Sequence, residues 1–404
     1  MNTIRIGLIR EGKMPLDHRV PLAPVSAQYI NQNIPNVEVI CQSSGHRAYS
    51  DQEYQDAGVP VVDDVSHCDL LMGVKEVPID QLISGKTYFF FSHTIKQQEY
   101  NRELLRAILD KQITLVDYEC LTNDTGNRLL AFGRYAGIVG AYNTIWAFGQ
   151  RYNLFHLKRA KDCFDLDQLK QEFTKVSLPA IKIVLTGGGR VAKGAMEVLM
   201  GLGIRRVSPA QFLLQDYVEP VFVQLNARDY HLHKEGALFN RHEFFNDPEN
   251  YQGNFLPFAC QADILIAGAY WDSRAPVLFS PQDPLKPDFK IKVIGDITCD
   301  IRGSIPSTLK ASSIDEPLYD YNPSEDKMEL PLTDEANITV MSIDNLPGEL
   351  PRDASHDFGE DFIQNVLPSL LDSQDHDMIN RATIAKQGTL TENYVYLQDF
   401  IDGD

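Results

Sequence analysis

The chain has 404 residues, of which 43% are hydrophobic and 23% are charged, so it is neither disordered nor fibrous. Its formal net charge of −19 would repel phosphate backbones, which argues against general nucleic-acid binding. No apolar run is long enough for a membrane span, and the charged N-terminus is unlike a signal peptide. The six scattered cysteines are typical of reduced thiols, so we expect a cytoplasmic protein.

The first part of the chain alternates between short β-rich runs and polar stretches that are compatible with helices. The runs expected to be strands are 3–9, 37–41, 70–74, 87–91 and 113–117. The helix-compatible stretches between them include 25–31, 51–57 and 97–110. Alternation at this spacing predicts a parallel α/β sheet.

A second series of strands follows a long linking stretch at 136–152. The strands that we expect in it are 181–186, 264–267, 292–296 and 338–343. Residues 211–258, rich in aromatic, histidine and charged side chains, are interpreted as an insert, because a doubly wound domain usually has a short connection there. An amphipathic helix is predicted over 357–371, and its apolar stripe must be buried against another element.

A glycine-rich loop follows the run 181–185 and precedes a helix-forming stretch. Read as G-x-G-x-x-A, it contains Gly187, Gly189 and Ala192. Strand, glycines and helix in this order predict a site where a dinucleotide pyrophosphate meets a helix N-terminus. The alternative is a glycine-rich turn without a ligand. The acidic residue that normally binds the adenosine ribose about 20 positions on is missing, because 205–208 reads RRVS.

Polar side chains follow two apolar runs of the first series. Lys75 follows 70–74, and His93 follows shortly after 87–91. Open α/β sheets bind ligands at the carboxyl ends of parallel strands, and a lysine and a histidine there could perform acid/base chemistry. The ordinary alternative is a solvated lysine and a histidine that ends a strand.

Other polar residues allow a binding role or an ordinary one. Arg19 could hold a carboxylate through two hydrogen bonds, or be a surface arginine. Asp344 follows the last expected strand and could bind a ligand or form a turn. His231 and His233 would share one face of a strand, but no third ligand lies nearby in the sequence, so we predict no metal site.

Several segments together resemble one enzyme family. They are REGKMPLDHRVPLAP (10–24), DQEYQDAG (51–58), GVKEVP (73–78), GKTYFFFSHTIKQQE (85–99), LVDYECLTNDTGNRLLAFGRYAG (115–137), TGGGRVAKGA (186–195), AGAYWDSRAP (267–276), GDITCDIRGSI (295–305) and SIDNLPGELPRDAS (342–355). The set resembles the lysine-forming saccharopine dehydrogenases. It resembles more closely the lysine–2-oxoglutarate reductase half of bifunctional aminoadipic semialdehyde synthase, with alanine dehydrogenase and transhydrogenase as distant relatives.

The resemblance implies an α/β fold of two Rossmann-like parallel-sheet domains with an interdomain cleft. A discontinuous substrate domain would combine 1–134 with 345–404. The dinucleotide-binding domain would take 135–344, including the insert 211–258. The shorter stand-alone enzymes of the family lack such an insert, which is similar to that of the bifunctional enzyme.

The resemblance also implies roles for individual residues. Lys75 and His93 would be the acid/base pair. The residues expected to line the substrate site are Arg19, Glu76, Glu119, Arg128 and Asp344. Those expected to bind the cofactor are Gly187, Gly189, Arg190, Val191, Ala192, Ser208 and Asp296.

The expected reaction is the reversible condensation of L-lysine with 2-oxoglutarate to saccharopine, through an imine that NAD(P)H reduces. NADP(H) is favoured over NAD(H), because the acidic residue that would repel a 2′-phosphate is absent. An arginine and Ser208 stand in that region instead and could bind the phosphate. The expected partners are these small molecules, with neither nucleic acid nor a membrane, and the oligomeric state stays open. The alternatives are an alanine- or opine-type amino-acid dehydrogenase and a catalytically silent nucleotide-binding protein of the same fold.

Overall fold

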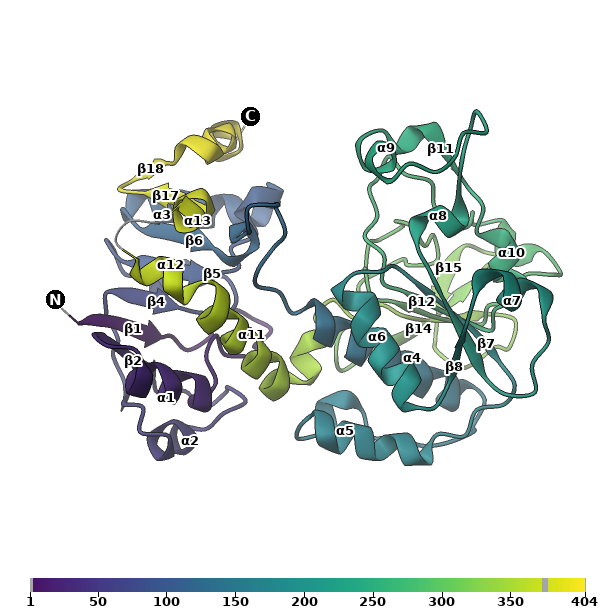
Figure 1. Cartoon of the computed structure of the whole chain (residues 1–404), viewed down its shortest axis with the longest axis horizontal. Coiled ribbons are helices and arrows are strands. Elements are labelled where there is room, and N and C mark those ends of the chain that lie inside the picture. Colours follow the sequence, from purple (N-terminus) through teal and green to yellow (C-terminus); the bar gives the residue numbers. More distant parts are fainter. Residues whose placement is uncertain (1–2, 373–376, 404) are drawn as a thin grey trace. The chain divides into compact units, whose positions relative to one another are not determined.

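The computed structural model describes residues 3–372 and 377–403, and the chain forms two compact units (Figure 1). Unit 1 takes the chain up to Phe132 and again from Pro351 onward, and unit 2 is Gly133–Leu350. The chain passes from one unit to the other between residues 132 and 133 and again between 350 and 351. The limits predicted from the sequence are 134/135 and 344/345. Each unit contains an eight-stranded sheet of its own.

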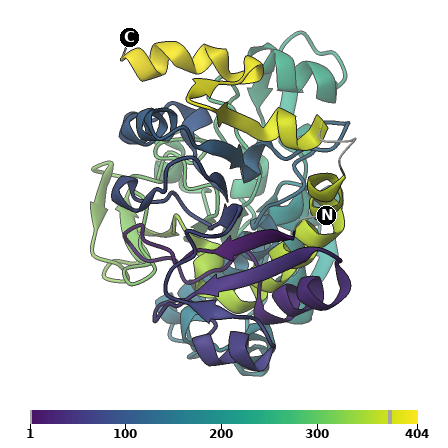
Figure 2. The same ribbon diagram turned by 90° about the vertical axis from the view of Figure 1, so that its left-hand side faces the viewer.

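The sheet of unit 1 has the order β18-β17-β6-β5-β4-β1-β2-β3 (Figures 1 and 2). The strands β1 to β6 run parallel, and β17 and β18 add an antiparallel edge from the C-terminal part of the chain. The strands are β1 (Ile4–Leu8), β2 (Val37–Gln42), β3 (Val61–Val62), β4 (Leu70–Met72), β5 (Thr87–Phe90), β6 (Thr114–Asp117), β17 (Thr383–Lys386) and β18 (Thr389–Leu390). The helices are α1 (Pro24–Asn33), α2 (Asp51–Asp56), α3 (Arg102–Asp110), α11 (Pro351–Asn365), α12 (Leu367–Leu371), α13 (Asp377–Ala382) and α14 (Gln398–Asp402).

The amphipathic helix predicted over 357–371 is two helices, α11 and α12. The first begins six residues earlier than predicted, at Pro351, because proline is well suited to the first turn of a helix. The break at Val366 comes just before Pro368, whose ring and missing N–H disrupt a continuous helix. Phe358 and Phe362 are buried in the core of unit 1, so the C-terminal segment completes the unit that the N-terminal segment begins.

The sheet of unit 2 has the order β15-β14-β16-β13-β12-β7-β9-β8. Its parallel strands are β7 (Lys182–Thr186), β8 (Arg205–Val207), β9 (Val221–Leu225), β12 (Ile264–Ala267), β13 (Val293–Asp296) and β16 (Ile338–Met341). The antiparallel edge is β14 (Leu318–Asn322) and β15 (Lys327–Glu329). The helices are α4 (Gly133–Arg151), α5 (Leu166–Glu172), α6 (Arg190–Gly201), α7 (Pro209–Leu214), α8 (Ala227–Tyr230), α9 (Arg241–Asn246) and α10 (Leu256–Ala259).

The stretch 211–258 differs from the predicted insert, because it contributes a strand to the sheet, β9, between β7 and the edge strand β8. Strand β9 is fully buried and pairs in parallel with β7 over its whole length. Only the part after β9 stands apart: a two-stranded ribbon, β10 (His231–His233) with β11 (Tyr251–Gly253), packs with α9 around Phe244 (Figure 1). The strand was missed because its five residues lie among polar and aromatic residues that hide the apolar run.

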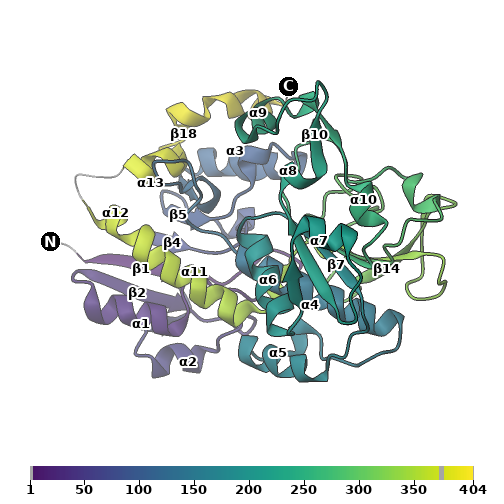
Figure 3. The same ribbon diagram turned by 45° about the vertical axis from the view of Figure 1, so that its right-hand side comes forward.

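Two glycines let helices α4 and α6 pack backbone to backbone, and the two helices lie side by side in Figures 1 and 3. A Cβ atom on Gly137 would lie 2.8 Å from the backbone N of Ala195 and closer still to the carbonyl O of Val191. A Cβ atom on Gly194 would lie 2.9 Å from the carbonyl C of Arg134. Because α6 follows the glycine loop directly, this close packing also fixes the loop.

Candidate active site

Lys75 and His93 lie at the carboxyl ends of two adjacent parallel strands, β4 and β5. The pairing continues beyond β4 and β5, since the N–H of Phe91 donates to the carbonyl of Val74 at 3.0 Å. Lys75 follows Val74 directly, and His93 comes two residues after Phe91, so both side chains belong to one edge of the sheet. Both residues are half-buried.

The pKa of the Lys75 amine is lowered, first by burial and next by the charge of the Arg19 guanidinium. The carboxylates of Asp17 and Glu76 act in the opposite direction, and the charge of Lys13 lowers the pKa further. A lysine whose charged form is disfavoured can release and accept a proton closer to neutral pH than a solvated lysine can.

Glu76 connects His93 to the same group of charges. Its Oε1 atom lies 2.8 Å from Nδ1 of His93, and its Oε2 atom lies 2.7 Å from Nζ of Lys13. Burial raises the pKa of the Glu76 carboxyl, but the contacts with His93 and Lys13 outweigh it and lower the pKa to about 2. The Glu76 carboxylate therefore stays ionised at neutral pH and orients the imidazole ring, which also stacks on Phe91.

Arg19 is buried and bound by its neighbour in the sequence. Its Nε and Nη2 atoms donate to the two carboxylate oxygens of Asp17 at 2.9 and 2.6 Å, and its guanidinium lies over the ring of Phe132. The charge of Arg19 still reaches the active-site edge, because it acts on Lys75. Any carboxylate bound by Arg19 would share this guanidinium with Asp17.

Glu119 and Arg128 form a second charged group on unit 1. Nη2 of Arg128 donates to Oε1 of Glu119 at 3.0 Å, and the Lys96 amine lies 3.7 Å from the same oxygen. The Glu119 side chain is only 7% exposed, whereas that of Arg128 is 42% exposed. Oε2 of Glu119 is buried and has no hydrogen-bond partner within the described ranges, so it is available to a cationic group of a ligand.

The glycine loop of unit 2 has the geometry that a pyrophosphate requires. Gly187 has φ of +101°, and a Cβ atom there would lie 2.8 Å from the carbonyl O of Gly268. Gly189, by contrast, has no described atom within 4 Å of its Cβ position, and as the N-cap of α6 it has no side chain to cap the helix. The N-terminus of α6 thus begins beside an exposed loop with open space at Gly189, which fits an anion.

The three residues after Gly189 begin α6 and differ in exposure. Arg190 is exposed and Val191 is half-buried, whereas Ala192 is completely buried. A Cβ atom on Gly268 would meet Cγ1 of Val191 at 3.0 Å, so a small residue is needed where the helix packs on the end of β12.

Ser208 does not lie at the strand end that borders the glycine loop. It follows β8, the edge strand, and its hydroxyl accepts from the N–H of Gln211 to cap α7. The neighbour of β7 is β9, although β9 comes later in the sequence. The residue at the carboxyl end of that neighbouring strand is Asn226, and a Cβ atom on Gly188 would lie 2.6 Å from its Oδ1.

Two aspartates of the prediction have different surroundings. Asp296 is buried at the end of β13, where its oxygens accept from the hydroxyls of Thr298 and Thr308, both at 2.6 Å, and from the N–H of Cys299 at 3.2 Å. These bonds give the Asp296 carboxylate a role within its own turn. Asp344 is exposed beyond the end of β16 in unit 2.

The structure also places charged residues at the active-site edge that the sequence reasoning did not select, namely Glu11, Lys13, Asp17 and Lys96. The first three follow β1, the strand next to β4, so the rule that ligands bind at strand ends could have found them. Lys96 lies in a 3₁₀ turn after His93, and no signal in the sequence marks it.

The two histidines considered as metal ligands, His231 and His233, bind other groups in the described chain. Residues 3–372 and 377–403 contain no group of three or more histidine, cysteine or acidic side chains that could hold a metal. His231 instead bonds the carbonyl of Ala227, and His233 lies 3.1 Å from Glu243. Within the same ranges, no helix is long and apolar enough to cross a bilayer.

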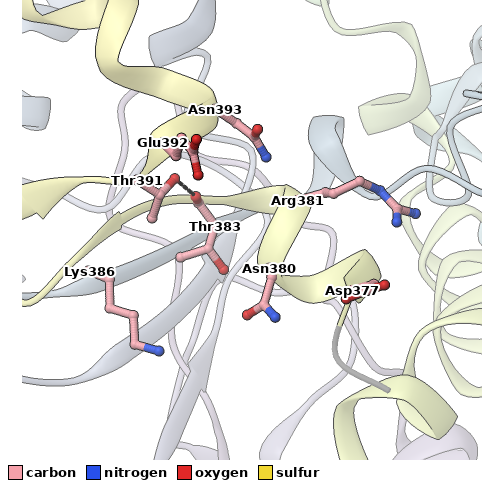
Figure 4. A pocket seen from close by; sticks show the side chains of 8 residues that line it. All are labelled: Asp377, Asn380, Arg381, Thr383, Lys386, Thr391, Glu392 and Asn393. Atoms are coloured by element: carbon pink, nitrogen blue, oxygen red, sulfur yellow. Dashed lines mark hydrogen bonds between the residues drawn. The ribbon is translucent and has the colours of Figure 1, made fainter. Parts of the chain in front are cut away.

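Figure 4 shows a polar pocket formed by α13, β17 and the residues that follow β18 in unit 1. It contains none of the predicted site residues. Its lining is Asp377, Asn380, Arg381, Thr383, Lys386, Thr391, Glu392 and Asn393.

Comparison with solved structures identifies the fold. The structure of an L-alanine dehydrogenase matches with a TM-score of 0.64 and 17% sequence identity, covering 99% of each chain. A transhydrogenase from Sinorhizobium meliloti matches with a TM-score of 0.62 and 16% identity, covering 96% of this chain and all of that one. The two parallel-dominated sheets are therefore Rossmann-like, as predicted.

Comparison with protein sequences identifies the relatives. Residues 7–139 match the family "Alanine dehydrogenase/PNT, N-terminal domain". The alpha-aminoadipic semialdehyde synthase of Mus musculus is 31% identical over 441 residues, and the match covers 97% of this chain and 47% of that protein. This chain thus spans about half the length of that relative. The "Saccharopine dehydrogenase [NAD(+), L-lysine-forming]" of Yarrowia lipolytica is 27% identical, covering 94% of this chain and 95% of that enzyme. The chain is therefore a homologue of the lysine-forming saccharopine dehydrogenases, with the fold of alanine dehydrogenase and transhydrogenase.

Proposed function

We propose that this protein is an oxidoreductase that condenses L-lysine with 2-oxoglutarate and reduces the imine to saccharopine, in a reversible reaction. The observation that carries the proposal is the edge of the unit 1 sheet, where Lys75, with its lowered pKa, neighbours the hydrogen-bonded pair of Glu76 and His93. The relatives named as lysine-forming saccharopine dehydrogenases support saccharopine and lysine as the reactants. The six cysteines are free, which agrees with a reducing compartment such as the cytoplasm.

Imine formation requires protons to move at two atoms. The amine of lysine adds to the ketone carbon of 2-oxoglutarate and loses a proton, and the carbinolamine hydroxyl then leaves as water after it accepts a proton. Lys75 and His93 can hold and transfer these protons, since one is a lysine made less basic and the other is an imidazole that Glu76 orients. When bound, the reduced nicotinamide supplies the hydride for the imine carbon.

The charged groups around the acid/base pair suit the charges of the substrates. 2-Oxoglutarate carries two carboxylates, and two cations can bind them: Arg19, whose charge acts on Lys75, and Arg128, which donates to Glu119. The buried free oxygen of Glu119 suits the ammonium group of an amino acid. We assign these residues to substrate binding, together with the exposed Asp344.

The glycine loop fits a dinucleotide, and we propose that it prefers NADP(H). An enzyme that uses NAD normally has an acidic residue at the end of the strand next to the first one, where it bonds the ribose hydroxyls. Here that position is Asn226, whose side chain is uncharged, and the carboxylate of Asp229 close by is held by the backbone N–H of Asn226 at 2.7 Å. Gln224 donates to the carbonyl of Gly187 and accepts from Arg206 at 2.6 Å, which keeps a cation close to the loop.

Asn226→Asp should therefore reverse or weaken the cofactor preference. An added carboxylate repels the 2′-phosphate and can accept from ribose hydroxyls, so the ratio of kcat/KM for NADPH to that for NADH should fall about tenfold or more, which corresponds to roughly 1.4 kcal/mol. Specificity constants for both cofactors, at saturating lysine and 2-oxoglutarate, measure this ratio.

Ser208→Ala is the matched comparison, because it removes the hydroxyl that the sequence pattern predicts at the ribose position. It should lower stability by about 1 kcal/mol through loss of the helix cap, and leave the cofactor ratio unchanged. If Ser208→Ala shifts the ratio and Asn226→Asp does not, the assignment of the ribose position is wrong. The NAD(+) in the name of the Yarrowia lipolytica relative makes this comparison informative.

The runner-up function is an amino-acid dehydrogenase of the alanine or opine type, and the structure of L-alanine dehydrogenase is the observation in its favour. Oxidation of NADPH and NADH with 2-oxoglutarate and a panel of amines separates the possibilities. Lysine should be preferred over ammonia and other amino acids. Turnover of pyruvate with ammonia would favour the runner-up, and no turnover with any pair would indicate a silent nucleotide-binding protein.

A further inference from the structure

Two carboxylates that the acid/base chemistry does not use flank the strands that carry Lys75 and His93. Glu11 follows β1, and Asp117 is the last residue of β6. In the strand order β6-β5-β4-β1, strand β5 leads to His93 and strand β4 leads to Lys75. Asp117 ends β6, the neighbour of β5, and Glu11 follows β1, the neighbour of β4. Strands β5 and β4, which lead to His93 and Lys75, therefore each have a carboxylate at the end of the strand beside them.

Glu11 binds the backbone of the turn that carries Lys75. Its Oε1 accepts from the N–H of Val74 at 2.6 Å, and its Oε2 accepts from the N–H of Lys75 at 2.9 Å. The turn has little room to adjust, because a Cβ atom on Gly73 would lie 2.9 Å from Cδ1 of Ile9 and 3.3 Å from Oε1 of Glu11. The two hydrogen bonds thus fix the backbone from which the Lys75 side chain extends.

Asp117 binds the backbone of the turn that carries His93. Its Oδ2 accepts from the N–H of Ser92 at 2.9 Å and from the Ser92 hydroxyl, and its Oδ1 accepts from the N–H of Glu119 at 2.7 Å. The Ser92 hydroxyl also contacts that of Thr94, so the residues on both sides of His93 are held.

His93 itself has a backbone conformation that needs such support. Its φ of 54° lies in the left-handed region, which strains a residue other than glycine and persists only when the surroundings enforce it. Asp117 is completely buried, and burial raises the pKa of its carboxyl group. Burial likewise raises the pKa of the Glu11 carboxyl, to about 7. Both carboxylates are thus held in surroundings that disfavour their charge.

We propose that Glu11 and Asp117 are positioning residues, which act on the reaction through the backbone turns of Lys75 and His93. The proposal rests on the acid/base roles given to those two residues. An amide cannot replace either carboxylate, because each has N–H donors on both oxygens and an amide would turn its own NH₂ group toward one of them. A misplacement of about 1 Å at a reacting group can lower turnover about 100-fold.

Glu11→Gln and Asp117→Asn should each lower kcat about 10- to 100-fold, while KM for lysine and 2-oxoglutarate changes less than about threefold. Asp69→Asn is the matched control. Its carboxylate also accepts from a backbone N–H of the same sheet, that of Arg5 at 2.8 Å, but at the amino ends of the strands. The control should keep full kcat.

A second readout does not depend on catalysis. Acetic anhydride in trace amounts acetylates amines at rates that report their protonation and exposure, and mass spectrometry of peptides measures each site. Glu11→Gln should change the acetylation rate of Lys75 about threefold or more relative to the exposed Lys327, and Asp69→Asn should not. If Glu11→Gln fails to fold, Ser92→Ala provides the corresponding kinetic test on the His93 side.

The two readouts separate the possible failures. A changed acetylation rate of Lys75 with full kcat would mean that Glu11 positions Lys75 but that the proposed acid/base role fails. Full kcat together with an unchanged acetylation rate in Glu11→Gln would overturn the positioning role of Glu11, and full kcat in Asp117→Asn would overturn that of Asp117. A rise in KM without a fall in kcat would assign both carboxylates to substrate binding instead.

Discussion

Lys75→Met should lower kcat about 100-fold or more, because a group that transfers protons in the reaction is lost. Methionine is similar to lysine in length, so the packing around the half-buried side chain is kept while the amine is removed. The Kd for NADPH should stay the same, since the glycine loop belongs to unit 2. Steady-state oxidation of NADPH gives kcat, and titration of cofactor fluorescence gives Kd.

Lys86→Met is the control for this experiment. Lys86 precedes β5 at the amino ends of the same sheet, where its amine donates to the carbonyl of Cys68 at 2.8 Å. This variant should retain its kcat. Near-full turnover of Lys75→Met at saturating lysine would show that the acid/base assignment is wrong.

Gly137→Ala and Gly194→Ala should have the largest effects on stability. A methyl group at either position would be driven into the backbone of the opposite helix, and a backbone cannot move aside as a flexible side chain can. We expect a loss of about 3 kcal/mol, at the upper end of what overpacking usually costs. That loss should lower the Tm of unit 2 by about 6–12 °C, given 2–4 °C per kcal/mol for a domain of this size.

The same two variants should weaken cofactor binding, because α6 cannot shift without displacing the glycine loop. Gly189→Ala separates the two effects. No described atom lies within 4 Å of a Cβ atom there, so Tm should hardly change, whereas the added methyl group should obstruct the approach of the pyrophosphate. Gly45→Ala, in an equally open position of unit 1, should alter neither the Tm nor cofactor binding. Unchanged stability of Gly137→Ala in calorimetry would contradict the close packing of α4 and α6.

The parts of the fold that the sequence predicted share one property, which is a short apolar run bounded by polar residues. The runs at 70–74 and 264–267 correspond to β4 and β12, because strands of parallel sheets are buried on both faces. The linking stretch 136–152 is the helix α4, whose small residues serve its packing and obscure its periodicity.

The order of strands in the sheet could not be read in the same way. Strands β8 and β9 follow each other in the sequence, but the later one pairs with β7. Counting residues from the glycine loop therefore led to Ser208, whereas the sheet places Asn226 at the strand end beside the loop. Similarly, the rule that ligands bind at strand ends found Lys75 and His93, but only the pairing of β4 with β1 brings Glu11 into contact with the Lys75 turn.

The transfer of a label from the cofactor to the product tests the central claim most directly. NADPH that carries deuterium at the transferable position of its nicotinamide ring is incubated with the protein, lysine and 2-oxoglutarate, and the products are analysed by mass spectrometry. The account predicts saccharopine that is one mass unit heavier, with the deuterium on the carbon that was the ketone carbon of 2-oxoglutarate. Unlabelled saccharopine, or label found only in a product of pyruvate and ammonia, would contradict it.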